Sequence, residues 1–439
     1  MSMGQKGSTR MEAQQLAVPA TSPSPANLPD DIHAEILVHL PAKSVHRFRS
    51  VCKAWRRITT DPRFLAAHPR RRPPEVLMYR YVDSSHCENR PINYAVDVAL
   101  DALPVSGEVS GWRPLVSYPK FATTSDSTTK RWYHSMPQHC LLLDSCNGVL
   151  LFKKAVGSSY FLCNPVTRQW AELPEITVTG RDGHRRAARG VTEYAFYFHE
   201  RSGEFRLLCD HSSFSVVHGQ TNTWYVLSTC AAEPRHVDPH ATNIDNLISL
   251  LSTATTPLAL HGRVHWPPRL IRRGESSTTM EMVAFDTVSE KFHVMAGPPA
   301  AAPVRMKMFA MDGLLVAANL GDARQVVELW FLADYGAGRW EHRYRLEVPW
   351  GWSTCPDYHP GMSSIAAAAD DQGNIILGNQ YGSCVYNVRA WMSWAVSYVA
   401  TPDNGVLMSR HVFRESLVQH PGFHAWSSSA DLPLIHFGC

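Results

Sequence analysis

A polar residue followed by glycine and an apolar run recurs beyond residue 75, and no other pattern constrains the fold as strongly. The four copies are Asn147-Gly148-VLLF, His261-Gly262-RVHW, Asp312-Gly313-LLV and Gln372-Gly373-NIIL. Glycine accepts a positive φ at little energetic cost, so such pairs favour the tight turn of a β-hairpin. The glycines lie 114, 51 and 60 residues apart, which indicates a unit of about 50 to 60 residues with one unmarked copy.

A second pattern is a pair of strand-forming residues that bracket six others. Its copies are Cys163-NPVTRQ-Trp170, Phe198-HERSGE-Phe205, Val217-HGQTNT-Trp224, Phe285-DTVSEK-Phe292 and Ala333-DYGAGR-Trp340. Two hairpins in each unit give four strands, which is the content of one propeller blade. Residues 76–439 are therefore predicted to form an all-β, β-propeller-like domain of about six or seven blades. Two β-sandwich domains with ordinary hairpins are the alternative.

The segment before this domain has helical periodicity instead. Apolar residues line one face of a predicted helix over Asp30–Leu40, and Pro41 ends it. A second helix is predicted from about Ser44 to Thr59. We therefore expect an α+β multidomain chain: a disordered leader over 1–26, a helical unit over 27–67, a basic proline-rich linker over 68–75, and the β domain.

The apolar stripe of the two helices is larger than the helices can bury against each other. Its members are Leu28, Pro29, Ile32, Ile36, Leu37, Leu40, Val45, Phe48, Val51, Cys52 and Trp55. Because a propeller can close its own core, we expect this stripe to bind another protein, with Trp55 as the anchor. Val45 and Phe48 are expected to face inward. Docking of the stripe on the chain's own β domain is the alternative.

Composition excludes several classes of function. The net charge of +3 over 439 residues favours neither a nucleic-acid binder nor a membrane-surface protein. The ten cysteines include no C-x-x-C pair, and the N-terminus has no apolar core of a secretory signal. A reducing compartment, the cytosol or the nucleus, is therefore expected.

Specific residues in both parts resemble a known family. In the helical unit they are Leu28-Pro29-Asp30-Asp31, Glu35-Ile36-Leu37, Leu40-Pro41-Ala42-Lys43-Ser44 and Arg47-Phe48-Arg49-Ser50-Val51-Cys52-Lys53-Ala54-Trp55-Arg56, which resemble an F-box. The β domain is similar to the kelch-like, F-box-associated region of plant F-box proteins. Its most telling residues are Ser145-Cys146-Asn147-Gly148, Cys163-Asn164-Pro165-Val166-Thr167-Arg168-Gln169-Trp170 and Leu173-Pro174.

The resemblance implies the substrate-receptor subunit of a Skp–cullin–F-box ubiquitin ligase. Such a subunit binds a Skp-family adaptor, and through it a cullin and a RING subunit, and presents a target protein whose identity the sequence does not give. It carries out no catalysis and needs no cofactor or metal. The adaptor-binding residues implied are Leu28, Pro29, Ile32, Ile36, Leu37, Leu40, Pro41, Val51, Cys52 and Trp55.

Other functions have weaker support in the sequence. Residues 43–72 hold ten basic residues against one acid, Asp61, as a helix-turn-helix protein that binds phosphates would. Thirteen tryptophans would suit a glycan-binding propeller, although Trp170, Trp224, Trp330 and Trp340 occupy strand positions typical of core packing.

An enzyme has the least support, because no G-x-S-x-G, H-E-x-x-H, P-loop or G-x-G-x-x-G motif occurs. His236-Val-Asp238-Pro-His240 lacks a third metal ligand. Asp286 and Glu290 lie in a predicted turn, where acids commonly stabilise turn geometry.

Overall fold

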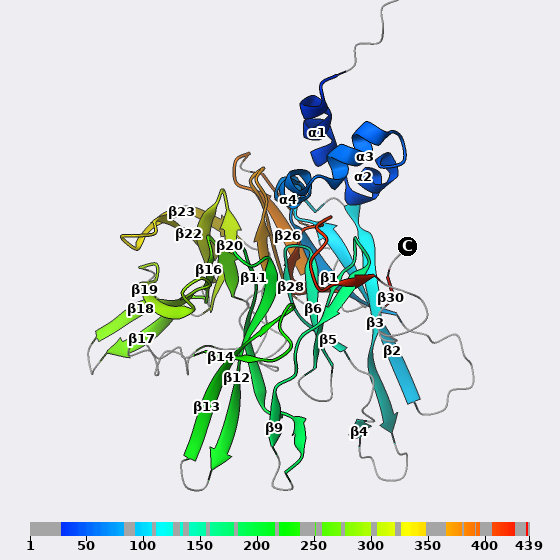
Figure 1. The fold of residues 1–439 in the computed structure, drawn as a ribbon. Helices are drawn as coiled ribbons and strands as arrows, with labels where there is room; N and C mark the ends of the chain where they lie inside the picture. The colour runs from blue at the N-terminus through cyan, green and yellow to red at the C-terminus, as the bar shows by residue number, and fades with distance from the viewer. Residues whose placement is uncertain are drawn as a thin grey trace, which may run out of the picture.

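The computed structural model describes two parts of the chain, an N-terminal helical unit and a β-propeller (Figure 1). The described residues are 28–82, 93–107, 111–125, 132–134, 140–154, 159–179, 183–215, 219–237, 251, 257–273, 277–299, 305–320, 326–347, 366–379, 382–390, 392–395, 406–425 and 436–437. The predicted leader, 1–26, lies outside them.

Four helices make up the helical unit: α1 (Asp30–Val38), α2 (Ala42–Phe48), α3 (Lys53–Thr60) and α4 (Pro62–Arg71). The prediction of a single second helix over 44–59 is wrong, because α2 ends at Phe48 and a separate helix begins at Lys53. The Cys52 sulfur caps α3 by accepting a hydrogen bond from the Trp55 amide at 3.4 Å. A capped start satisfies a backbone N–H that has no partner in the first turn of a helix.

The predicted linker also begins too early, because residues 68–71 belong to α4. The Asp61 carboxylate caps this helix by accepting from the Arg63 amide at 2.7 Å, and Pro62 occupies the first turn. The buried His68 ring lies 2.9 Å from the Leu40 carbonyl, which ties α4 to the end of α1. Tertiary contacts of His68 therefore extend the helix into a run that reads as linker in the sequence.

In the described residues the β domain has six sheets of four or more strands. Blade 1 contains β1 (Glu75–Val82), β2 (Asn93–Pro104), β3 (Arg113–Ser125), β4 (Trp132–His134), β28 (Val406–Phe413) and β30 (His436–Phe437). Blade 2 contains β5 (Cys140–Cys146), β6 (Val149–Lys154), β7 (Tyr160–Asn164), β8 (Gln169–Glu172) and β29 (His424–Ala425). Blade 3 contains β11 (Val191–His199), β12 (Glu204–Ser215), β13 (Gly219–Ser228) and β14 (Arg235–Val237).

The remaining three blades follow in chain order. Blade 4 contains β15 (Leu258–Leu260), β16 (Arg263–His265), β17 (Arg269–Arg273), β18 (Ser277–Asp286) and β19 (Lys291–Ala296). Blade 5 contains β20 (Arg305–Met311), β21 (Leu314–Leu320), β22 (Val326–Asp334) and β23 (Arg339–Glu347). Blade 6 contains β24 (Ala366–Ala369), β25 (Asn374–Asn379), β26 (Gly382–Asn387) and β27 (Met392–Ala395), and a separate ribbon, β9 (Thr177–Thr179) with β10 (Arg185–Ala187), joins blades 2 and 3.

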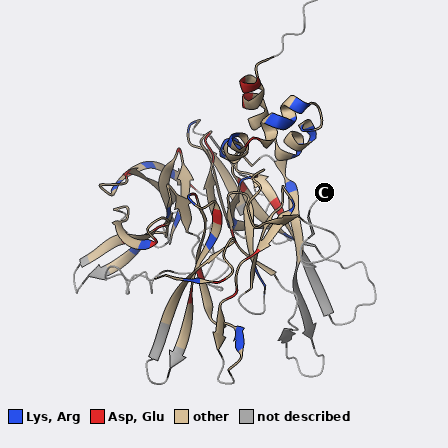
Figure 2. Ribbon diagram, in the orientation of Figure 1, with Lys and Arg blue, Asp and Glu red and all other residues tan. Residues whose placement is uncertain are grey.

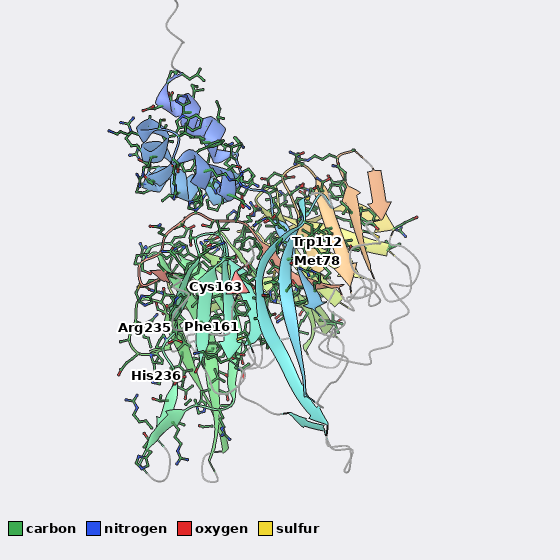
Figure 3. The ribbon with its side chains drawn as sticks, turned by 90° about the vertical axis from the view of Figure 1, so that its right-hand side faces the viewer. Met78, Trp112, Phe161, Cys163, Arg235 and His236 are labelled. Atoms are coloured by element: carbon green, nitrogen blue, oxygen red, sulfur yellow. The ribbon has the colours of Figure 1, made fainter. Side chains whose placement is uncertain are left out.

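The ring is closed by strand β28, which pairs antiparallel with β1 and also contacts β24 of blade 6 and β5 of blade 2. Six apolar clusters confirm the closure, because each one joins two neighbouring blades and the sixth joins blade 6 to blade 1. In Figure 3, Met78 and Trp112 mark the cluster between blades 6 and 1, and Phe161 and Cys163 mark that between blades 1 and 2. The predicted propeller is therefore confirmed, with six blades.

Both repeated sequence patterns lie at hairpin turns. Asn147, His261 and Asp312 have φ of 47°, 53° and 52°, and each precedes a glycine of positive φ that joins the first two strands of a blade. Four of the six-residue brackets also lie at turns between paired strands, as in Cys163 with Trp170 and Phe285 with Phe292. Val217 of the fifth bracket lies outside the described residues. Trp224 and Trp340 are buried in the core, as their strand positions predict.

One hydrogen-bonding arrangement, which the sequence patterns did not reveal, recurs in the turns β7–β8, β18–β19, β22–β23 and β26–β27. Asn164, Asp286, Asp334 and Asn387 each accept backbone hydrogen bonds on the side-chain oxygen from residues two or three positions later. Such turns mimic a backbone turn and need a short polar side chain at that position. The role predicted for Asp286 in turn geometry is thus confirmed.

Candidate functional site

The inward side of the helical unit packs on the chain's own propeller. Its core consists of Leu37, Val38, Ala42, Val45, Ile58 and Phe64, and it also contains Leu417 from the segment after β28. Leu37 is only 1% exposed. The prediction that Leu37 contacts a partner is therefore corrected, because its side chain packs in the core of the chain. The inward orientation predicted for Val45 is confirmed.

The outward side of the same helices exposes apolar side chains. Leu28, Ile32, Ile36 and Val51 are 50%, 44%, 52% and 62% exposed, and we call these four residues the outer apolar set. They make up half of the large exposed hydrophobic residues in the described part of the chain. Single exposed apolar residues are ordinary, but several on one small unit indicate a surface that another molecule covers.

Trp55 lies between the two sides. Its ring centroid is 5.1 Å from that of Phe48 and 5.9 Å from that of His33, both in edge-on geometry, and the side chain is half-buried. Trp55 therefore stabilises the packing of α3 against α1 and α2. Leu40 is also half-buried, whereas Pro29, Pro41 and Cys52 are exposed, and their contacts with a partner stay a prediction.

Charge is divided unevenly over the helical unit (Figure 2). Acids lie on α1, where Asp30 pairs with Arg57 and Glu35 pairs with Arg71. Six cations on α2, α3 and α4 are exposed and have no ion pair among the described residues: Lys43, Arg47, Lys53, Arg56, Arg63 and Arg70. Arg49 is different, because burial lowers its pKa and its guanidinium donates to the Thr59 carbonyl at 2.9 Å.

A buried ionic cluster joins the helical unit to the propeller. The Glu415 carboxylate accepts from the Ala42 amide at 2.9 Å and pairs with Arg72 at 2.7 Å and Arg113 at 3.4 Å. Arg113 also pairs with Glu75 at 2.6 Å. Burial raises the pKa of Glu75, and the Arg113 guanidinium opposes that rise. Two guanidinium groups and two carboxylates thus lie together where the helical unit meets the propeller.

Comparison with known proteins supports the division of the chain into a helical unit and a propeller. Residues 26–66 match the F-box domain family, and residues 112–386, more than half of the chain, match the F-box associated beta propeller domain family. The chain belongs to this F-box propeller family. The resemblance to plant F-box proteins is thereby confirmed.

Its relatives include two proteins of Arabidopsis thaliana. F-box protein At3g07870 is 24% identical over 73% of this chain and 72% of the relative, and F-box protein At5g18160 is 26% identical over 74% and 71%. Among solved structures, YjhT overlaps 52% of this chain and 70% of its own at 10% identity and a TM-score of 0.29, too low to bear on function.

The family match does not extend over the whole propeller that the structure shows. It begins at residue 112, after β1 and β2, and ends at residue 386, before β28. The strands that close the ring are therefore visible from their pairing and not from the family likeness. The docking of the F-box through Glu415 and Leu417 likewise has no counterpart in the sequence patterns, because its partners are hundreds of residues apart.

Within the described residues, neither the run around His236 nor the turn with Asp286 and Glu290 forms a cluster of metal ligands. In the part of the chain that the structure describes, no group of three or more His, Cys, Asp or Glu could hold a metal ion. His236 lies on the outer strand β14 (Figure 3), with its ring 4.5 Å from Tyr225, and residues 238–240 of the same run lie outside the described residues. Glu290 is occupied by ion pairs with Arg206 and Arg235.

Proposed function

We propose that this chain is the substrate-recognition subunit of a Skp–cullin–F-box ubiquitin ligase. The outer apolar set carries the proposal, because the propeller closes its own core and the F-box still exposes Leu28, Ile32, Ile36 and Val51. A Skp-family adaptor would cover this set and connect the chain to a cullin and a RING subunit. The subunit would act in the cytosol or nucleus and would itself catalyse no reaction.

The target would bind the propeller. The hairpins β2–β3, β9–β10 and β12–β13 extend from the end of the propeller opposite the F-box (Figure 1). A target held at that end would leave the adaptor-binding side free. Proximity of the target to the ubiquitin-conjugating enzyme would then raise the effective concentration of its lysines.

The test is recovery of a purified Skp-family adaptor and cullin by the full chain. The triple change Leu28→Ala, Ile32→Ala and Ile36→Ala should reduce recovery at least tenfold, because it removes the exposed apolar side chains on α1 and just before it. The matched control is Leu270→Ala on β17, because this side chain is 51% exposed but belongs to blade 4. Undiminished recovery by the triple variant would overturn the proposal.

Nucleic-acid binding is the second candidate, favoured only by the six exposed cations of α2, α3 and α4. Those cations lie on the F-box and not along the propeller, so they would give a small footprint of phosphate contacts. A titration with duplex DNA across a salt series distinguishes the two candidates.

A further inference from the structure

The four residues after the closing strand, 414–417, form a segment that contacts both domains, and we call it the junction segment. On the F-box side, the Glu415 carboxylate accepts from the amide of Ala42, the first residue of α2, and pairs with Arg72 after α4. The start of α2 and the end of α4 are thus held by one buried side chain, which is 4% exposed.

The junction segment also completes the apolar core of the F-box. Leu417 is 1% exposed and packs in the same cluster as Leu37, Val45 and Phe64. Val166, in the turn between β7 and β8, contacts this cluster from blade 2. The F-box core is therefore made partly by residues of the propeller domain.

The propeller holds the other side of the junction segment. The Asn164 side chain donates to the Ser416 carbonyl at 3.1 Å. Gly148 leaves space for the segment, because a β-carbon there would lie 2.6 Å from the Ser416 β-carbon and 2.7 Å from the Arg414 carbonyl. Arg113 of β3 pairs with Glu415 and with Glu75 of β1, so the ionic cluster extends into blade 1.

We propose that Glu415 and Leu417 are positioning residues that fix the direction in which the F-box points from the propeller. With the segment bound on both sides, the adaptor and the target would keep a constant distance and orientation relative to each other. A freely hinged F-box would instead sample many relative orientations. The consequence for ubiquitin transfer rests on the proposed function, because the constant offset limits which target lysines come within reach. The fixed direction itself is a property of the chain alone.

The direction is measured by the distance between two spin labels on the full chain. Ketone-bearing residues at Ala54 on α3 and Arg339 on β23, both exposed, take the labels and leave the ten cysteines unmodified. The parent chain should give one narrow distance distribution. Glu415→Gln keeps the shape and an acceptor for the Ala42 amide but removes the charge that Arg72 and Arg113 share.

We expect Glu415→Gln to broaden the distribution, and Glu415→Gln with Leu417→Ala to at least double its width. Gln419→Ala is the matched control, because this side chain is exposed two residues beyond the junction segment. Thermal unfolding of the propeller, followed by near-ultraviolet circular dichroism, checks that the ring remains folded. A distribution as narrow as the parent's in the double variant would overturn the proposal, and so would equal broadening by Gln419→Ala.

A second measurement separates this inference from the proposed function. The outer apolar set is exposed and is not part of the core cluster that Leu417 completes, so Glu415→Gln should retain adaptor recovery while the label distances broaden. If the adaptor is never recovered, the proposed function fails although the distance result still decides the positioning role. Loss of adaptor recovery in Glu415→Gln with unchanged distances would instead assign Glu415 to adaptor binding and overturn the positioning role.

Discussion

Ile36 and Leu37 are consecutive residues of α1, yet their side chains are 52% and 1% exposed. The two residues represent the two sides of the F-box. The inner side packs around Leu417 from the segment after β28, and the outer side carries large apolar side chains that stay exposed. A single helix thus divides one apolar stripe between its own chain and the partner that we propose.

The largest effect expected is a contrast in stability between these two positions. Leu37→Ala should lower the free energy of unfolding by about 2–5 kcal/mol, because it leaves a cavity in the F-box core. Ile36→Ala should change it by about 0.5 kcal/mol or less, since the side chain is exposed. Chemical denaturation measures both. Equal losses would contradict the division of the stripe.

The inner side can also be disturbed from the propeller, at Gly148. Its φ of +80° strains any other residue by about 1–2 kcal/mol, and a β-carbon would overlap the junction segment, which adds about 1–3 kcal/mol. Gly203→Ala is the control, because φ there is +69° but nothing lies within 4 Å. Denaturation of both alanine variants should show the larger loss at Gly148, and a loss at Gly203 as large would exclude the contact with the junction segment.

The pH dependence of stability tests the burial of the C-terminal segment beyond the F-box contact. Burial against Phe198 and Phe205 lowers the pKa of His420 to about 4. The unfolded chain therefore binds a proton near pH 6.5 that the folded chain does not accept. Stability should fall as the pH drops below 6.5, by about 2 kcal/mol from this residue at pH 5.

The variant His420→Phe should flatten that pH dependence, whereas His424→Phe, at an exposed position four residues later, should leave it unchanged. Urea denaturation at a series of pH values measures both. An unchanged slope in His420→Phe would show that its ring is accessible to water.

The smallest effect is expected for the cations of the outer side. Duplex DNA should bind the full chain weakly and without sequence preference, and the affinity should fall as salt rises. Lys53→Ala with Arg56→Ala should weaken this binding further without altering the free energy of unfolding by more than about 0.5 kcal/mol. Fluorescence titration measures the affinity. Tight, sequence-selective binding would favour a nucleic-acid function over the ligase function.

Much of the fold could be predicted because its determinants are local. A glycine at a hairpin turn, or Pro41 after a helix, acts on its immediate neighbours, and the turns at Asn147, His261 and Asp312 formed where the sequence placed them. The helix break before Lys53 is also local, but it depends on a cysteine acting as a cap, which is an uncommon use of that side chain.

The candidate site was predictable only as one stripe. Periodicity shows which residues are apolar on a helix face, but it does not say which other part of the chain meets that face. The burial of Leu37 depends on Leu417, and the length of α4 depends on the contact of His68 with Leu40. Such long-range pairs leave no pattern in a single sequence. Only the structure therefore shows which apolar residues of the stripe lie on the inner side and which on the outer side.

The hydrogen bond from Ala42 to Glu415 joins residues 373 positions apart, and β28 pairs with the first strand of the ring. During synthesis the F-box helices leave the ribosome well before the residues that complete their core, because Glu415 is made 373 positions after Ala42. Contacts of such separation form slowly, because the loop between them must close before they stabilise anything. A nascent chain that stops before Val406 therefore lacks both the strand that closes its ring and the residues that complete its F-box core.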